Sequence, residues 1–249
     1  MCFDADSFPP IPVIRGAALS HEDVVLEARD GNRLAAFVAT PDEPTAVGVV
    51  ILPDVRGLYR FYEELALRFA ERGILAAAID YFGRTAGIGK RDDDFEYMPH
   101  VQQTTPEGVQ ADVGAAVDYL RSQGVRTLFT VGFCFGGRNS WLAAAGGHGL
   151  AGAIGFYGRP ADVTKRASEL EAPILALQAG ADQNITAEDN AAFEQALQAA
   201  GVEYELVTYE GAPHSFFDRK QEEYADSSED AWAKVLAFIE THAGERLHA

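Results

Sequence analysis

One cysteine of this chain lies in a setting that could make it a nucleophile. The segment Gly132 to Gly137 reads GFCFGG and places Cys134 between a run that predicts a strand and a run that predicts a helix. This G-x-nucleophile-x-G pattern is typical of a sharp strand-to-helix turn, in which glycines avoid collisions with nearby backbone. Free N–H groups at the helix start favour a thiolate and a developing oxyanion, and Phe135 is one expected donor. A buried, inert cysteine is the alternative interpretation.

A base and an orienting acid follow Cys134 along the chain. Asp182, in LQAGADQNI, lies just beyond an apolar run, at the carboxyl end of a predicted strand where ligand sites of parallel sheets collect. His214, in YEGAPHSFF, lies in the loop after the next predicted strand. Taken singly, Asp182 could be a loop cap and His214 an ordinary loop residue. Their order and setting together predict a catalytic triad of Cys134, His214 and Asp182.

The elements that would position these residues alternate along the chain. Short apolar runs and helix-patterned segments predict βα units in a mostly parallel central sheet flanked by helices. Before them, two β-rich runs flank Asp30-Gly31 and predict an N-terminal antiparallel hairpin. The predicted strands are Val47–Leu52, Ile74–Ile79, Arg126–Gly132, Gly152–Tyr157, Ile174–Ala179 and Glu203–Tyr209, and the predicted helices are Leu58–Glu71, Pro106–Ser122, Gly136–Ala145, Ala187–Ala200 and Ser228–Thr241.

Two segments fall outside this alternation. Residues 1–20 are rich in proline and polar residues without a period, which predicts an irregular N-terminal arm on the surface. Residues 83–105 contain glycines and an acidic run at the end of a predicted strand, and could form a lid or a solvated excursion. Because no linker or internal repeat is visible, we expect residues 1–249 to form a single α/β domain.

The bulk composition narrows the partners. A net charge of -18 would repel the phosphates of nucleic acid and the anionic face of a membrane, so neither is expected as a partner. The longest apolar runs are far shorter than the roughly 20 residues that cross a bilayer. Cys2 and Cys134 do not suggest a disulfide framework, and the N-terminal residues lack signal-peptide features. These observations favour a cytoplasmic protein.

The order of these segments and their short sequence motifs resemble those of the dienelactone hydrolase family. This family is a branch of the α/β-hydrolases whose nucleophile is a cysteine in G-x-C-x-G-G. The likeness runs from about Val47 to the C-terminal helix and includes LPDVRGL, AAIDYFGR, the GFCFGG turn, a strand ending in FYG, and GAPHSF. The resemblance implies an α/β-hydrolase fold. It also implies a carboxylic ester hydrolase of the carboxymethylenebutenolidase type.

The resemblance also implies roles for residues around the nucleophile. The family's loop after the first core strand supplies a carboxylate and an oxyanion N–H, and Asp54 and Val55 hold these positions here. A characterised member of the family has a glutamate at the acidic position, so a turn-forming role for the shorter Asp54 is the alternative. The family's substrates are enol-lactones whose carboxylate is held by arginines, which makes Arg84 and Arg219 the substrate-binding candidates. At the second position the family's arginine aligns with Asp218, one residue before Arg219.

The triad and the resemblance together predict hydrolysis of a small-molecule ester or lactone through an acyl-thioester, with no metal and no organic cofactor. The same triad could serve thioester hydrolysis, acyl transfer or peptide cleavage, and a non-catalytic ligand receptor on the same scaffold is a further alternative. A dinucleotide-binding oxidoreductase is disfavoured because no G-x-G-x-x-G follows the first core strand. The sequence leaves open whether the protein is a monomer or a homodimer.

Overall fold

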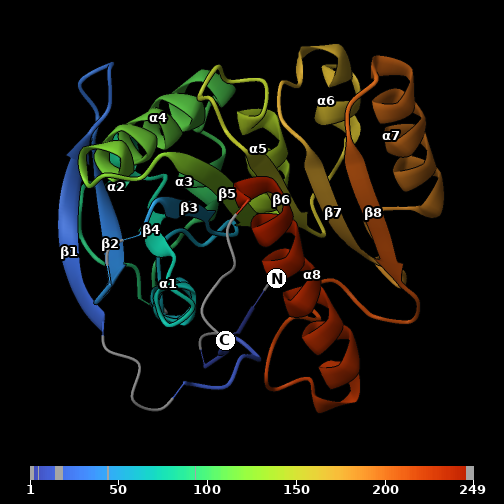
Figure 1. Ribbon diagram of the computed structural model, residues 1–249, viewed down its shortest axis with the longest axis horizontal. Helices are drawn as coiled ribbons and strands as arrows, with labels where there is room; N and C mark the ends of the chain where they lie inside the picture. Colours follow the sequence, from blue (N-terminus) through green and yellow to red (C-terminus); the bar gives the residue numbers. More distant parts are fainter. Residues whose placement is uncertain (1–2, 5, 15–18, 44, 93, 245–249) are drawn as a thin grey trace.

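The computed structural model describes residues 3–4, 6–14, 19–43, 45–92 and 94–244. Within these residues, eight strands form one sheet in the order β1-β2-β4-β3-β5-β6-β7-β8 (Figure 1). The β1–β2 and β2–β4 pairs are antiparallel, and the remaining neighbours are parallel. The strands are β1 (Leu19–Glu27), β2 (Arg33–Pro41), β3 (Val47–Leu52), β4 (Leu75–Ile79), β5 (Thr127–Phe133), β6 (Gly152–Phe156), β7 (Ile174–Ala179) and β8 (Tyr204–Tyr209).

Helices cover both faces of this sheet (Figure 1). Helices α1 and α8 lie on one face, and α4, α5 and α7 lie on the other. The helices are α1 (Arg60–Ala70), α2 (Gly83–Ala86), α3 (Met98–Val101), α4 (Pro106–Ser122), α5 (Phe135–Ala143), α6 (Ala161–Thr164), α7 (Ala187–Ala200) and α8 (Ala225–Ala243), with single 3-10 turns at Ala167–Glu169 and Glu222–Tyr224. In the described residues, no helix combines the length and the apolar character that a membrane span requires.

Burial on both faces explains why the central strands are apolar along their whole length. All six residues of β3 are buried. Val49 and Ile51 pack in the cluster that contains residues of α1 and α8, whereas Val50 and Leu52 pack in the cluster that contains residues of α4. Successive side chains of a strand point to opposite faces, so a strand between two helical layers needs an apolar residue at every position.

The predicted architecture of a mostly parallel sheet with an N-terminal hairpin is confirmed. Helices α4 and α7 have the predicted bounds because their ends carry local signals: the Thr105 side chain accepts the N–H of Gly108, and Thr186 and Asp189 form a capping box. Helix α8 begins at Ala225, before the predicted Ser228. The four-residue helices α2, α3 and α6 are too short to produce a helical period in the sequence.

The segment after β4 is bound to the body of the protein through a buried ion pair. Arg91 lies 2.8 Å from Asp80, and the two side chains are 5% and 1% exposed. The Asp80 carboxylate also accepts the backbone N–H groups of Leu58 and Phe82. A single carboxylate therefore joins the end of β4, the loop before α1 and the segment of residues 83–105, called the insertion below.

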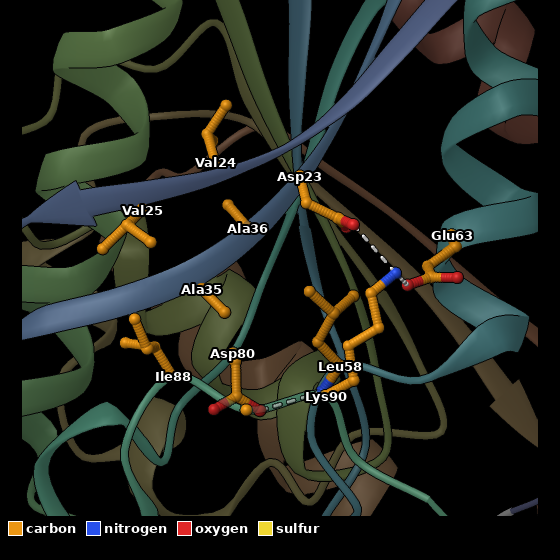
Figure 2. A pocket seen from close by; sticks show the side chains of 11 residues that line it. Asp23, Val24, Val25, Ala35, Ala36, Leu58, Glu63, Asp80, Ile88 and Lys90 are labelled. Atoms are coloured by element: carbon orange, nitrogen blue, oxygen red, sulfur yellow. Dashed lines mark hydrogen bonds and ion pairs between the residues drawn. The ribbon is translucent and has the colours of Figure 1, made fainter.

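Lys90, in the same segment, borders a hollow of about 220 Å³ between the hairpin, the loop before α1 and the insertion (Figure 2). Figure 2 shows its ammonium group between the carboxylates of Asp23 of β1 and Glu63 of α1. The Nζ atom lies 3.0 Å from an oxygen of each carboxylate. The charged side chains around this hollow are thus paired with one another. These ion pairs connect the insertion to β1 and α1, which is a structural role.

In the predicted N-terminal arm, the described residues 3–4 and 6–14 contain no helix or strand, whereas Leu19 and Ser20 already belong to β1. The arm does not lie only on the surface. Phe3, Ser7 and Ile11 are 2%, 1% and 5% exposed. The Phe3 ring stacks on Phe61 of α1 with ring centroids 4.0 Å apart. The expectation of a surface arm is wrong because isolated apolar side chains without a period can still find buried positions in the tertiary structure.

We predict that Asp80→Ala lowers the free energy of unfolding by about 3–5 kcal/mol, because it leaves Arg91 buried without its partner and two buried N–H groups without an acceptor. Chemical denaturation of both proteins measures the difference. Asp23→Ala is the matched control: its ion pair with Lys90 is exposed, so we expect a loss below about 1 kcal/mol. Similar small losses in both variants would contradict a structural role for the buried pair.

Candidate active site

Cys134 lies at the apex of a sharp turn between β5 and α5. Its backbone angles are φ 55° and ψ -111°, a region that residues other than glycine rarely adopt. A Cβ atom at Gly132 would lie 2.0 Å from the carbonyl oxygen of Gly136, and a Cβ atom at Gly136 would lie 2.0 Å from that of Leu52. The glycines of the GFCFGG segment are therefore required because the turn packs directly on its own backbone and on the end of β3.

The turn is fixed to the neighbouring strand and opens a helix. The backbone N–H of Cys134 donates to the carbonyl of Phe156 at the end of β6, at 2.9 Å. Phe135 is the first residue of α5, so its N–H has no acceptor within the helix. The partly exposed Cys134 side chain thus lies beside the positive end of a helix dipole, which favours a thiolate and an oxyanion.

Asp182 and His214 are brought together from the loops that follow β7 and β8. The Nδ1 atom of His214 lies 2.5 Å from the Oδ2 atom of Asp182, whose side chain is 1% exposed. The other carboxylate oxygen accepts the backbone N–H of Asn184 at 2.8 Å. The N–H of Ala181 also donates to the carbonyl of Ala212, which joins the two loops directly.

The charges of the three side chains support one another. Burial by itself lowers the pKa of His214, but the hydrogen bond to Asp182 and the neighbouring Cys134 outweigh it and raise this pKa to about 9. Burial opposes the ionisation of Asp182, yet the hydrogen bonds from His214 and from the Asn184 backbone hold its pKa below the ordinary value. This arrangement favours an imidazolium between a carboxylate and a thiolate.

A cavity of about 440 Å³ contains the predicted reacting groups. Cys134 and His214 line it together with Val55 and Phe135, the two predicted oxyanion donors. Met98 of α3, in the 83–105 insertion, forms part of the same lining. The structure thus brings the predicted nucleophile, the predicted base and both predicted donor residues to one cavity, with Asp182 hydrogen-bonded to His214.

Asp54 lies next to this group but does not line the cavity. It is fully buried, and one carboxylate oxygen accepts the backbone N–H of Arg56 at 2.8 Å while the other accepts the Tyr59 hydroxyl. Burial, opposed by the hydrogen bond from Arg56 and aided by the charge of Cys134, raises the pKa of Asp54 to about 7. These contacts correspond to the turn-forming alternative and fix the loop that carries Val55.

The two arginines predicted to bind substrate lie elsewhere, and both assignments need correction. Arg84 forms ion pairs with Asp112 at 2.5 Å and Asp30 at 2.6 Å. Arg219 lies over the ring of Phe8, in the N-terminal arm. Neither lines the cavity of Cys134. The short sequence motifs pointed to arginines near strand ends and the His214 loop. They could not reveal that the guanidinium groups of Arg84 and Arg219 already contact other residues of the protein.

Two other arginines do line the cavity, and the sequence reasoning missed them. Arg138 lies one helical turn after Cys134, and Arg159 directly follows the FYG segment at the carboxyl end of β6. The Nε atom of Arg138 is buried and has no hydrogen-bond partner among the described residues. The helical spacing from Cys134 and the position at a strand end were signals that could have identified both.

The model of the dienelactone hydrolase family matches residues 34–243. The chain belongs to this family. The predicted resemblance is thereby confirmed, and family membership makes the chain a hydrolase of the ester or lactone type.

The alignments with individual relatives cover most of this chain and most of each relative. A protein of Escherichia coli (strain K12) that carries the name of a carboxymethylenebutenolidase is 30% identical over 87% of this chain and 85% of its own. A Bradyrhizobium protein named as a 2-oxo-3-(5-oxofuran-2-ylidene)propanoate lactonase is 27% identical over 86% of this chain and 91% of its own. A crystal structure from Klebsiella pneumoniae, named as a dienelactone hydrolase, has a TM-score of 0.77 at 25% identity and covers 89% of this chain and 98% of its own.

We predict that Asp182→Asn lowers the pKa of His214 from about 9 toward the ordinary value near 6.5, because the carboxylate that stabilises the imidazolium is lost. NMR titration of the protein labelled with ¹⁵N in its histidines measures this pKa directly. A pKa that stays near 9 in the variant would show that Asp182 does not stabilise the charged ring.

The same pair makes stability depend on pH, and the sign follows from the two shifts. The raised pKa of His214 contributes stability that is complete below about 6.5 and is lost as the pH rises through about 9. The lowered pKa of Asp182 contributes stability that is present above about 3.8 and is lost on further acidification. Urea unfolding should therefore show the largest difference between wild type and Asp182→Asn at pH 4–6.5, and a smaller one at pH 10.

Proposed function

We propose that this protein hydrolyses a carboxylic ester or lactone with Cys134 as the nucleophile, His214 as the acid and base, and Asp182 as the orienting carboxylate. One observation carries the proposal. The His214–Asp182 hydrogen bond of 2.5 Å lies beside a cysteine held at φ 55° in a cavity that Val55 and Phe135 also line. This is the arrangement that covalent catalysis at a carbonyl requires.

In the first step the Cys134 thiolate attacks the carbonyl carbon, and the carbonyl π electrons move to oxygen. The N–H groups of Phe135 and Val55 would stabilise the resulting oxyanion. When the carbonyl re-forms, the ester C–O bond breaks and protonated His214 transfers its proton to the leaving alkoxide or enolate. The product of this step is an acyl-thioester on Cys134.

In the second step His214, now neutral, takes a proton from water as the water oxygen attacks the thioester carbonyl. The C–S bond breaks, the Cys134 thiolate is restored, and the acyl group leaves as a carboxylic acid that ionises at neutral pH. For a lactone the leaving oxygen remains tethered to the acyl group, so the sole product is one open-chain hydroxy or oxo acid. These steps require only the substrate, water and the named side chains.

We further propose that Arg138 and Arg159 bind a carboxylate on the substrate. Both line the cavity of Cys134, and the buried Nε atom of Arg138 lacks a partner among the described residues. Arg138 makes a long contact of 3.4 Å with the half-exposed Asp162, which leaves donors free for an anion. Arginine suits this role because its planar guanidinium can donate two parallel hydrogen bonds to a carboxylate.

The insertion would complete this site. Tyr97 and Met98, both from the segment 83–105, line the cavity together with Cys134 and Phe135, and Met98 is 50% exposed. We propose that residues 83–105 cover the bound substrate, as a lid does, while the Arg91–Asp80 pair anchors the segment.

A reducing cytoplasm is the location that keeps a nucleophilic thiol active, because thiolates at exposed sites are readily oxidised.

Cys134→Ala should reduce hydrolysis of 4-nitrophenyl acetate and of a dienelactone by at least about 1000-fold, because no nucleophile remains. Steady-state assays on both substrates, with mass spectrometry of rapidly quenched enzyme to detect an acyl group on Cys134, test the proposal. Cys134→Ser serves as the control that retains a polar atom and a similar volume. Equal turnover by wild type and Cys134→Ala would contradict the assignment.

Arg138→Gln and Arg159→Gln should each raise KM for a carboxylate-bearing ester by about tenfold or more, since a charge-assisted hydrogen bond contributes about 1.5–3 kcal/mol. A neutral ester with the same leaving group is the internal control, and its KM should change by less than about twofold. Equal changes for the charged and neutral esters would show that the two arginines do not recognise a carboxylate.

A further inference from the structure

Residues 3–4 and 6–11 are the part of the N-terminal arm that contacts the site, and Phe3 among them contacts the loop that carries Val55. The Nη1 atom of Arg56, the residue after Val55, donates to the carbonyl of Phe3 at 2.8 Å. The ring of Phe3 is 2% exposed and stacks on Phe61 of α1, the helix that follows this loop. The first described residue of the arm is therefore fixed to the oxyanion side of the cavity.

The arm also contacts the loop that carries His214. Asp218, four positions after His214 and 5% exposed, accepts the Ser7 hydroxyl at 2.7 Å and the backbone N–H of Phe8 at 3.3 Å. In return, the N–H of Arg219 donates to the carbonyl of Phe8 at 3.0 Å. Because Ser7 is 1% exposed, these bonds are shielded from water and fix the arm to the histidine loop.

The ring of Phe8 joins the two sides a second time. The guanidinium of Arg60, at the start of α1, lies 4.3 Å from the ring centroid, and that of Arg219, from the histidine loop, lies 5.1 Å from it. Each arrangement is a cation–π contact. The arm is thus held between an element next to the oxyanion loop and an element next to the catalytic base.

A chain of aromatic rings leads from the arm to the reacting groups. The Phe3 ring lies 6.3 Å from that of Phe133, the residue before Cys134, and 6.4 Å from that of Tyr157. Tyr157 in turn lies 4.9 Å from the imidazole of His214. In a close-packed interior, loss of the Phe3 ring would allow Tyr157, and with it the His214 ring, to move.

We propose that the arm is a strap that sets the position of the oxyanion loop relative to the histidine loop, with Phe3, Ser7 and Asp218 as positioning residues for the reaction. The inference rests on the proposed function, since it takes His214 as the base and Val55 as an oxyanion donor. None of the three positioning residues lines the cavity, so they act through His214 and the loops and do not touch substrate.

Alkylation of Cys134 by iodoacetamide tests the strap without any substrate, with peptide mass spectrometry to separate Cys134 from Cys2. The reagent reacts with the thiolate, which His214 favours at low pH, whereas at high pH a thiol ionises without help. For Phe3→Leu and for Ser7→Ala we expect the alkylation rate at pH 6.5 to fall about tenfold and the rate at pH 9.5 to stay within about twofold. Asp218→Asn should reproduce the effect of Ser7→Ala, and combining the two should add little.

Phe193→Leu is the matched control for Phe3→Leu. Phe193 is also fully buried and packs on Trp141 with ring centroids 5.0 Å apart. Both belong to a separate apolar cluster that contains residues of α5 and α7. Its substitution removes the same ring and should lower stability by a similar amount. It should leave the ratio of the alkylation rates at pH 6.5 and pH 9.5 as in wild type.

The outcomes separate the strap from its alternatives. A changed ratio in Phe3→Leu and Ser7→Ala but not in Phe193→Leu supports the strap, even if the protein hydrolyses no ester, in which case only the proposed function fails. A wild-type ratio in both arm variants overturns the strap, whatever the hydrolase assays show. An equal change in Phe193→Leu also overturns it, because the effect would then be general destabilisation.

Discussion

The site depends on one unfavourable backbone conformation, the one at Cys134. A non-glycine residue at φ 55° and ψ -111° costs about 1–3 kcal/mol, so the surrounding structure must impose it. The carbonyls of Leu52 and Gly136 approach the turn so closely that only glycine fits at positions 132 and 136. The bond from the Cys134 N–H to Phe156 ties the apex to the next strand. The result is a thiol that projects from a rigid turn at the start of a helix.

The other two members of the predicted triad meet Cys134 because the strands that carry them are parallel. Loops after β7 and β8 emerge at the same edge of the sheet as the turn after β5, which lets residues far apart in the chain share one cavity. The bond between Ala181 and Ala212 then fixes the two loops against each other. Only with that separation fixed can Asp182 hold the His214 ring in one orientation and raise its pKa.

Three buried carboxylates perform a similar structural task around this edge. Asp54 accepts an N–H from its own loop, and Asp218 accepts one from the N-terminal arm. Asp80 accepts one N–H from the loop before α1 and one from its own loop, as well as the Arg91 side chain. A loop that must be both precise and irregular has backbone donors without regular partners, and a carboxylate can satisfy two of them at once. On a chain with net charge -18, these acids are therefore structural, whereas the cavity itself is bordered by Arg138 and Arg159.

The sequence by itself determined the sheet, most helices and the identity of the catalytic candidates, because these depend on local signals: apolar runs, the Thr186 capping box, the glycines around Cys134, and polar residues at strand ends. Only the tertiary structure decided which arginines face the cavity and where the arm lies. Whether Arg84 is free depends on acids distant in the chain, and the burial of Phe3 depends on an aromatic cluster assembled from several elements. Such pairings leave no local period or motif, since a side chain's partners are chosen by the packing of the whole molecule.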